Sequence, residues 1–405
     1  MKQAVTGNAG PKVRSDVEVI LELTDSGGIE LTLKSKVKSM YGNAIEAQCR
    51  ELLSFFSIGN ARLTVNDSGA LPFVISARME AAVKALTGTE TSFLPEMITE
   101  NHYNSSRERF RFSRLYLPGN NPGMFINAGL HSPDGVILDL EDSVAPDRKD
   151  EARILVRNAL RAVNFYGAER MVRINQGERG LDDLDYVIPH NVHLVLIPKC
   201  ESAETVRKTD GKIKEIKQGA GQEGTVFLMP IIESAAGVEK AFEIATASES
   251  VVAIAIGLED YTADLGVQRT KEGKESLYAR NRLVVAARAA GIQPIDSVFS
   301  DVGDMAGLLD NILSSKAMGF EGMGCIHPRQ IAVIREGFSP TADEIDKAGK
   351  IVAAYHDALQ KGLGVVALGS KMIDPPVVAR AEKTISLAVR LGLLPENRAE
   401  AESKQ

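Results

Sequence analysis

The 405-residue chain is poor in several features that would assign it to common protein classes. It has no Trp and only three cysteines, Cys49, Cys200 and Cys325, which are far apart and form no metal-spaced pair. This pattern excludes a disulfide framework and is typical of a protein in a reducing compartment. Internal repeats and low-complexity segments are also missing, so a repeat architecture is not expected.

Long apolar runs and positive charge are lacking as well. No uncharged apolar run approaches the length of a membrane span, and residues 1–14 lack the apolar core of a signal peptide. The formal net charge of −7 argues against generic binding of nucleic acid. We therefore expect a cytoplasmic protein that binds neither membranes nor nucleic acid. The length predicts two domains, or one large barrel with an extra module.

What the chain does contain is a series of short apolar runs that end in polar residues. These residues are Asp139, Glu141 and Asp142, then Arg173, Lys199, Glu233, Glu259 and Asp260. An α/β barrel presents its active-site residues at the C-terminal ends of parallel strands. Strands alternating with helical stretches therefore predict a (β/α)8 TIM barrel. The eight candidate strands are 114–117, 135–140, 171–175, 193–198, 226–233, 251–257, 294–298 and 320–326.

The chain divides into the barrel and four other segments. The pattern predicts a small α+β domain at 1–86, a linker at 87–113, the barrel at 114–340, a helical segment at 341–395 and a charged tail at 396–405. In the first domain we expect two hairpins, 17–23 with 29–33 and 61–65 with 73–76, a helix at 37–56 and another from Ala77. In the C-terminal segment we expect helices at 343–359 and 376–391. The arginines of the linker are either solvated or in contact with a phosphorylated ligand near the barrel mouth.

Eight short motifs occur in order along residues 114–395. They are Leu117-Pro118-Gly119, Leu138-Asp139-Leu140-Glu141-Asp142, Val172-Arg173-Ile174-Asn175, Pro198-Lys199, Ile232-Glu233-Ser234-Ala235-Ala236-Gly237, Tyr278-Ala279-Arg280, Ile326-His327-Pro328 and Lys371-Met372-Ile373-Asp374. In these motifs the segment resembles the β subunit of citrate lyase, within the wider citrate lyase/malyl-CoA lyase barrel group. The resemblance implies a TIM barrel with a C-terminal helical lid.

A second set of motifs marks the first domain. It comprises Ala9-Gly10, Asp16-Val17, Tyr41-Gly42-Asn43-Ala44-Ile45, Asn66-Asp67-Ser68-Gly69-Ala70-Leu71 and Ala77-Arg78. Here the chain resembles the acyl carrier protein of citrate lyase, its γ subunit. Carrier and lyase are normally separate subunits, whereas in this chain they look fused.

Two positions depart from these families. The carrier serine that holds the CoA-like prosthetic group corresponds to Arg14, and Ser15 follows it. Either Ser15 is loaded instead or the carrier is not loaded. In the barrel, the arginine usual before Ser113 is replaced by Phe112, and Arg111 or Arg114 can take over its contact with the thioester cofactor, or part of that contact is lost.

The resemblance implies a Mg²⁺-dependent carbon–carbon lyase that cleaves a citryl thioester to oxaloacetate and an acetyl thioester. A citramalyl thioester, giving pyruvate, remains an alternative, as do thioester hydrolysis and a non-catalytic carrier or assembly role. Glu233 and Asp260 are the predicted metal ligands, since paired carboxylates with open positions suit Mg²⁺. They could instead form a polar rim or salt bridges. Strand alternation predicts that Glu259 points away from Asp260.

The other candidate residues follow from the same comparison. Arg173 is expected to bind a substrate carboxylate, or to pair with Glu141 or Asp142, which orient Arg173 or metal-bound water. Lys199 could meet a thioester oxygen or CoA phosphate, or be structural. The remaining cofactor-side candidates are Pro118, Gly119, Ile326 and His327, of which the His327 side chain is more often structural.

The resemblance also gives expectations about assembly. In related lyases the equivalent of Asp374 reaches a neighbouring subunit's active site, where the resemblance implies that it transfers the proton of the acetyl carbon. A role of Asp374 as a helix N-cap is the simpler alternative. We therefore expect a homo-oligomer, a trimer or a dimer of trimers, and a CoA-transferase partner subunit of the citrate lyase α type.

Overall fold

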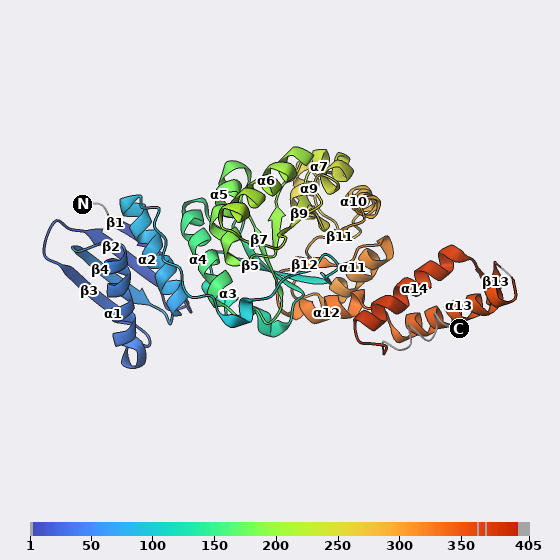
Figure 1. Cartoon of the computed structure of the whole chain (residues 1–405), viewed down its shortest axis with the longest axis horizontal. Helices are drawn as coiled ribbons and strands as arrows, with labels where there is room; N and C mark the ends of the chain where they lie inside the picture. The colour runs from blue at the N-terminus through green and yellow to red at the C-terminus, as the bar shows by residue number, and fades with distance from the viewer. Residues whose placement is uncertain (1–2, 363, 369–370, 396–405) are drawn as a thin grey trace. The chain divides into compact units, whose positions relative to one another are not determined.

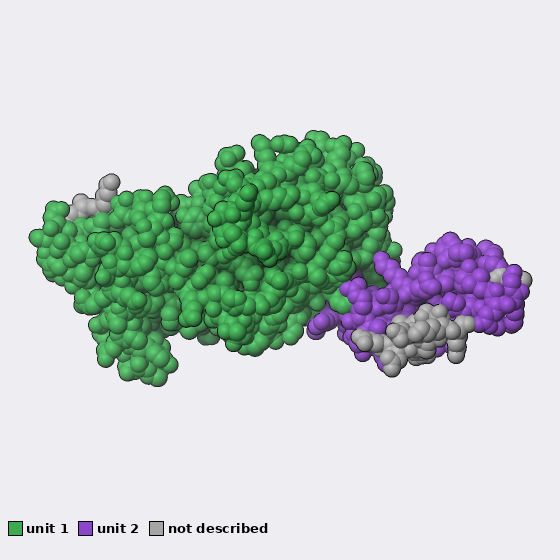
Figure 2. Space-filling view, viewed as in Figure 1, with its two compact units in different colours: residues 1–331 green, residues 332–405 purple. Residues whose placement is uncertain are grey.

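The computed structural model describes residues 3–362, 364–368 and 371–395. The chain forms two compact units, Met1–Ile331 and Ala332–Gln405 (Figure 2). The first unit contains both the N-terminal domain and the barrel. The predicted tail at 396–405 lies outside the described residues. No helix in the described part of the chain is long and apolar enough to cross a membrane.

The N-terminal domain is one four-stranded sheet with two helices (Figure 1). The strand order is β1-β2-β4-β3, in which β4 pairs antiparallel with β2 and parallel with β3. The domain is therefore α+β, as expected. Its elements are β1 (Gln3–Thr6), β2 (Val17–Leu23), β3 (Ile29–Ser35), α1 (Lys38–Phe55), β4 (Ala61–Asp67) and α2 (Pro72–Thr87).

Both predicted hairpins of this domain are wrong. Strands β2 and β3 do not pair with each other, because β4 lies between them and α1 makes the crossover that a parallel β3–β4 pair requires. Residues 73–76 belong to α2, which is buried along Phe73–Val83 because it contacts β1, β2 and α1 as well as α4 (Lys149–Ala162) of the barrel. A helix buried on all sides loses its amphipathic period, so its apolar run was mistaken for a strand.

The barrel has the predicted architecture. Its eight parallel strands follow chain order around the sheet, β12 pairs with β5, and a bridge between Asp296 and Met323 joins the two remaining edges (Figure 1). The strands are β5 (Ser113–Pro118), β6 (Gly135–Asp139), β7 (Glu169–Arg173), β8 (Leu194–Ile197), β9 (Phe227–Ile232), β10 (Ala253–Ile256), β11 (Gln293–Ile295) and β12 (Met323–Cys325).

Helices connect the strands and cover the outside of the barrel, while an apolar cluster that includes Met171, Leu196 and Met229 fills the inside. Each strand therefore has both faces buried, which explains its continuous apolar sequence. The helices are α3 (Pro122–Phe125), α4, α5 (Gly177–Val187), α6 (Ala203–Gly219), α7 (Ala235–Glu239), α8 (Ala241–Ala245), α9 (Leu258–Asp264), α10 (Leu277–Ala290) and α11 (Met305–Met318), with short 3-10 turns η1 (Thr99–Asn101), η2 (Ala128–His131), η3 (Pro146–Arg148) and η4 (Ile188–His190). The next helix, α12 (Arg329–Phe338), spans the boundary between the two units.

The segment predicted as a linker is ordered and fastened to the barrel. The Asn101 side-chain amide donates to the carbonyls of Leu160 and Val163, each at 3.0 Å. Arg111 is fully buried and donates to both carboxylate oxygens of Glu169, at 2.7 and 2.8 Å. Glu169 is the first residue of β7, at the end opposite the polar strand ends. The suggestion that this basic stretch contacts a phosphorylated ligand at the barrel mouth is therefore wrong for Arg111.

The second unit is a helical hairpin with a small antiparallel sheet between its helices. It comprises α13 (Ala342–Gln360), β13 (Val366–Leu368), β14 (Lys371–Ile373) and α14 (Pro375–Arg390). An apolar cluster that includes Val352, Ile373 and Ile385 holds α13 against α14. Thr341 and Glu344 form a capping box at the start of α13. Both predicted helices of this segment are present.

Candidate active site

The C-terminal ends of the barrel strands surround a cavity of about 330 Å³. Its walls bring together residues far apart in sequence, among them Arg114, Tyr116, Arg173, Glu233, Asp260 and Ile326. A parallel barrel places its active site at this face. The fold and this collection of charged groups define the molecule as a (β/α)8-barrel enzyme.

Arg173 is the best-anchored charged group of the cavity wall. Its Nε and Nη2 donate to the two carboxylate oxygens of Asp139 at 2.6 and 2.8 Å, and its Nη1 lies 2.9 Å from Glu141 Oε2. Burial alone would lower the pKa of Arg173, but the hydrogen bonds and charge of Asp139 raise it above its ordinary value. The guanidinium is thus charged, rigid and has N–H groups left over for a ligand.

Asp139 was not predicted as a site residue, although a signal for it existed. Asp139 and Arg173 are the last residues of the neighbouring strands β6 and β7 and stand directly opposite each other in register. Residues paired in this way share a face of the sheet. The ion pair with Glu141 is the one that the sequence offered as an alternative for Arg173.

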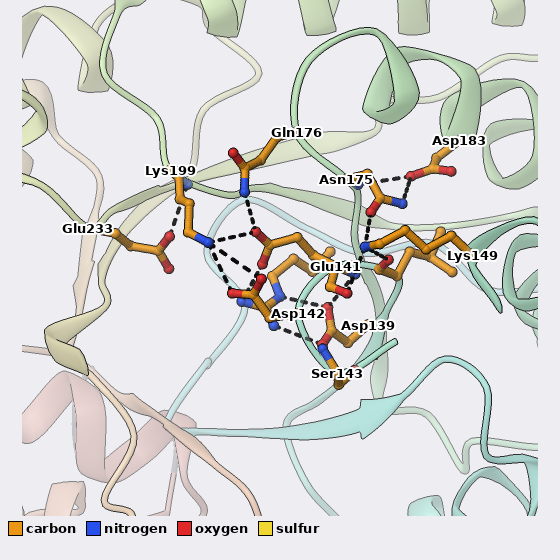
Figure 3. A network of polar contacts seen from close by, with 12 residues as sticks. Asp139, Glu141, Asp142, Ser143, Lys149, Asn175, Gln176, Asp183, Lys199 and Glu233 are labelled. Carbon is orange, nitrogen blue, oxygen red and sulfur yellow. Dashed lines mark hydrogen bonds and ion pairs between the residues drawn. The ribbon is translucent and has the colours of Figure 1, made fainter. Parts of the chain in front are cut away.

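Lys199 lies among three carboxylates, of which Glu141 and Asp142 are labelled in Figure 3. Its Nζ is 3.2 Å from Glu141 Oε1, 3.2 Å from Asp142 Oδ2 and 3.5 Å from Asp260 Oδ1. Burial would lower the pKa of Lys199, but these carboxylates raise it above its ordinary value. A lysine held as an ammonium is a poor nucleophile, which disfavours Schiff-base chemistry at this position.

Glu141 and Asp142 have different environments. Glu141 is buried, and its Oε1 also accepts a hydrogen bond from Gln176 Nε2 at 2.8 Å (Figure 3). Asp142 is exposed, and Lys199 Nζ donates to its two oxygens. The Glu141 carboxylate therefore contacts both Arg173 and Lys199, and its orienting role stays a prediction.

Glu233 is an acid of the cavity wall with a strongly raised pKa. Burial, followed by the charge of Asp260, raises the pKa of Glu233 to about 8. The backbone N–H of Lys199 donates to its Oε2 at 3.1 Å. Gly257 leaves room for the carboxylate, because a Cβ at that position would lie 2.6 Å from Glu233 Cγ. An acid with this pKa is poised to accept a cation in exchange for its proton.

Asp260 reaches the cavity by a different route from the one expected. Strand β10 ends at Ile256, and Glu259 and Asp260 lie in the first turn of α9, so strand alternation does not apply to them. Both residues line the cavity. Glu259 forms a salt bridge with Arg269, whose Nη1 lies 2.7 Å from Oε1 of Glu259. The prediction that Glu259 points to the opposite face from Asp260 is therefore wrong, and what distinguishes Glu259 is its salt bridge with Arg269.

The chemistry of Glu233 and Asp260 fits a divalent cation. Within the described residues, no three acid, histidine or cysteine side chains form a metal cage. Two carboxylates with further positions left to water and ligand oxygens are the usual protein share of a Mg²⁺ site. Mutual repulsion of the two charges, visible in the raised pKa of Glu233, is what a cation would relieve.

The residues predicted to face the cofactor divide into two groups. Pro118 and Ile326 line the cavity. Gly119 donates its N–H to the Asp139 carbonyl at 2.8 Å, and a Cβ there would lie 2.4 Å from that oxygen, so the close approach requires glycine. His327 Nδ1 accepts the N–H of Arg329 at 3.1 Å, which is the structural role favoured for its side chain.

The N-terminal domain is fixed to the barrel by buried arginines. Arg78 donates to both oxygens of Asp16 at 3.0 Å, and to the side-chain and backbone oxygens of Asn120 at 2.6 and 3.2 Å. Arg157 of α4 donates to both oxygens of Glu80 in α2, at 2.8 and 2.7 Å. Since breaking a buried pair is strongly destabilising, we infer that this domain stays docked.

Ser15 lies in a loop beside the barrel mouth. A Cβ on Gly123 of α3 would lie 3.1 Å from the Arg14 carbonyl oxygen, and the next residue, Met124, lines the cavity. Ser15 is half-buried with φ 58°, and its N–H donates to the Ser68 carbonyl at 3.1 Å.

Asp374 belongs to the second unit. It is the N-cap of α14, and its Oδ1 accepts the N–H of Val377 at 3.2 Å. The helix-cap alternative is therefore present in the structure, and the cap uses one of the two carboxylate oxygens of Asp374.

Comparison with known proteins identifies the family. The family model described as HpcH/HpaI aldolase/citrate lyase matches residues 113–328, and the acyl carrier (ACP) model described as malonate decarboxylase delta subunit matches residues 2–86. The chain belongs to the HpcH/HpaI aldolase/citrate lyase family, is a carbon–carbon lyase, and carries an acyl-carrier domain at its N-terminus.

Individual relatives agree with this assignment. Citrate lyase subunit beta of Escherichia coli (strain K12) is 40% identical over 293 residues, which cover 72% of this chain and 97% of that protein. Mitochondrial citramalyl-CoA lyase of Homo sapiens is 32% identical over 336 residues, which cover 80% and 99%. The structure of CitE from Mycobacterium tuberculosis in complex with magnesium, acetoacetate and coenzyme A superposes with a TM-score of 0.59 at 29% identity, covering 70% of this chain and 99% of that one.

Proposed function

We propose that the protein cleaves a 3-hydroxy-3-carboxyacyl thioester, best a citryl thioester, to an oxo acid and an acetyl thioester with Mg²⁺ as cofactor. The observation that carries this proposal is the meeting of Glu233, Asp260 and Arg173 around one cavity. The relatives named for citrate lyase and citramalyl-CoA lyase, and the related structure with bound magnesium, support it.

Each group has a role in this reaction. Glu233 and Asp260 would hold the cation, which when bound supplies Lewis acidity that lowers the pKa of the substrate hydroxyl. Arg173 would bind a free carboxylate of the substrate with the N–H groups that Asp139 and Glu141 leave over. Lys199, kept as an ammonium by its carboxylate neighbours, would face the negative charge that develops on the thioester oxygen.

Cleavage begins with loss of the hydroxyl proton and breaks the bond between the carbinol carbon and the carbon next to the thioester. The enolate left on the acetyl thioester then takes up a proton. We propose Asp374 as the donor, acting across the interface of a homo-oligomer. The resemblance to related lyases supports this role, and the helix cap uses only one of the two carboxylate oxygens of Asp374.

The thioester enters either as a CoA ester or on a CoA-like group attached to Ser15, the hydroxyl next to Asp16. Pro118 and Ile326 line the cavity, and the Arg14 carbonyl next to Ser15 lies beside Gly123, the neighbour of the cavity-lining Met124, which supports an exit for the long arm on this side. A CoA-transferase subunit that loads the acyl group is the partner that the carrier domain suggests.

A matched pair of variants tests the function. Asp260→Ala removes one of two ligands and should lower Mg²⁺-dependent cleavage of citryl-CoA at least 100-fold. Glu259→Ala, at the neighbouring residue of the same helical turn, should cost less than about fivefold, because Glu259 pairs with Arg269. The assay measures oxaloacetate release against Mg²⁺ concentration. Equal losses in the two variants, or no cleavage of any hydroxyacyl thioester by the wild type, would contradict the proposal.

A further inference from the structure

Arg114 is a fully buried cation for which the structure provides no carboxylate partner. Arg114 is 1% exposed, and among the described residues its side chain makes one hydrogen bond, from Nη1 to Met229 Sδ at 3.0 Å. The Nε of Arg114 is buried with no acceptor at all. A thioether is a weak acceptor for a guanidinium, so most of the hydrogen-bonding capacity of Arg114 is unused.

The other arginines of the described chain that are at most 2% exposed have full partners. Arg78, Arg111 and Arg157 each pair with a carboxylate, and Arg170 donates to the carbonyls of Asn191 and Asn101. A buried charge without a partner is costly, and natural proteins rarely keep one unless it meets a ligand. Burial lowers the pKa of Arg114 to about 10, which still leaves it charged near neutral pH.

Arg114 also faces the right space. It lines the same cavity as Arg173, Glu233 and Asp260. On β5, Arg114, Tyr116 and Pro118 alternate onto one face, with Pro118 at the C-terminal end of the strand and Arg114 near its start. Arg114 therefore lies deep in the cavity, whereas the proposed metal ligands and Arg173 are at the strand ends.

This arrangement orders the parts of a substrate. The thioester arm must leave through the mouth, and the carbon that bears the hydroxyl and first carboxylate must lie at the strand ends. What remains is the fourth substituent of that carbon, which alone can extend toward Arg114. An apolar methyl group there would leave the charge unpaired, whereas a carboxymethyl group would satisfy it.

We propose that Arg114 binds the second free carboxylate of the acyl group and thereby selects a citryl over a citramalyl thioester. This inference rests on the proposed lyase function and specifies its substrate. It assigns Arg114 to the acid end of the substrate instead of the thioester cofactor.

The test compares the wild type with Arg114→Met on citryl-CoA and citramalyl-CoA. We expect the wild type to prefer citryl-CoA. In Arg114→Met, kcat/KM for citryl-CoA should fall about 30-fold or more, the effect of losing a charged hydrogen bond, and for citramalyl-CoA it should fall far less. Thermal unfolding should show an unchanged or higher midpoint, because a buried unpaired charge has been replaced by an apolar side chain of similar length.

Arg111→Met is the matched control, since Arg111 is equally buried on the same segment but paired with Glu169. It should lower the unfolding midpoint and shift neither substrate preference nor the citryl-to-citramalyl ratio. Calorimetric binding of oxaloacetate and of pyruvate in the presence of Mg²⁺ gives a second readout that needs no turnover. The wild type and Arg111→Met should both favour oxaloacetate, whereas Arg114→Met should not.

The possible outcomes distinguish the proposed role of Arg114 from the proposed lyase function. An unchanged citryl-to-citramalyl ratio in a folded Arg114→Met variant, or equal loss on both substrates, overturns the role of Arg114 and leaves the lyase intact. A wild type that prefers citramalyl-CoA also overturns the role of Arg114 and leaves the lyase function intact. A wild type that cleaves neither ester refutes the proposed function, and the binding preference for oxaloacetate still decides for or against Arg114.

Discussion

Gly257 makes room for the Glu233 carboxylate, and replacing it by alanine tests the geometry of the proposed metal site. A Cβ at position 257 would lie 2.6 Å from both Cγ and Oε1 of Glu233, whereas ordinary contacts begin at 3.4 Å. Glu233 must therefore move by about 0.8 Å, and because Cγ is near the base of the side chain, rotating the carboxylate alone does not relieve the clash. The backbone of Gly257 has no positive φ, so sterics are the only obstacle.

The size of the effect follows from this displacement. A misplacement of about 1 Å in a reacting geometry costs on the order of 100-fold in rate. Overpacking in a well-packed region costs about 1–3 kcal/mol of stability. We expect Gly257→Ala to lower Mg²⁺-dependent kcat/KM about 100-fold and to raise the Mg²⁺ concentration for half-maximal activity, with a folded protein.

The assay is a Mg²⁺ titration of citryl-CoA cleavage, with calorimetric Mg²⁺ binding beside it. Gly211→Ala is the control, because Gly211 lies in α6 with open space at its Cβ. It should leave activity unchanged and stabilise the protein by up to about 1 kcal/mol. Normal Mg²⁺ affinity and turnover in Gly257→Ala would show that Glu233 is not held where the metal site needs it, and the reasoning would fail.

Two further predictions concern pH and the docked domain. Because the pKa of Glu233 rises from 4.5 to about 8 on folding, its contribution to stability is complete below pH 4.5 and is lost as the pH rises toward 8. Metal-free protein should therefore lose about 2–3 kcal/mol between pH 6 and 8 in urea unfolding followed by circular dichroism, a slope that Glu233→Gln removes; parallel slopes in both proteins would refute this. Glu80→Gln leaves Arg157 buried without its charge partner and should destabilise the first unit by about 3–5 kcal/mol in the same assay. A cost below about 1 kcal/mol would mean that the N-terminal domain is loosely held.

The barrel could be predicted from the sequence because each of its strands is buried on both faces. Such strands read as apolar runs, and the polar residue that follows each run marks the end of the strand. All eight strands were located on this basis, and their order around the barrel follows from the right-handed connections of parallel strands. Glu233 and Arg173 reach the cavity for the same reason.

The N-terminal domain differs from its sequence-based prediction in α2 and in strand pairing. Helix α2 is buried by the sheet, by α1 and by α4 of the barrel, so its Phe73–Ser76 stretch has the composition of a strand. The signal for a helix was Pro72 at its first turn. The pairing of β3 with β4 depends on contacts far apart in sequence, which local patterns do not encode.

By itself, the sequence determined the residue types at each strand end. These residue types predicted the fold, the family and a site shared by two acids, Glu233 and Asp260, and one arginine, Arg173. Only the tertiary structure decided which partner each charge has. Asp139 pairs with Arg173 because the two residues are opposite each other in register. Arg269 forms a salt bridge with Glu259. Arg114 and Arg111 look alike in sequence, yet one is neutralised by Glu169 and the other faces the cavity uncompensated. Electrostatic interactions depend on distance and burial in three dimensions, and these quantities exist only once the chain is folded.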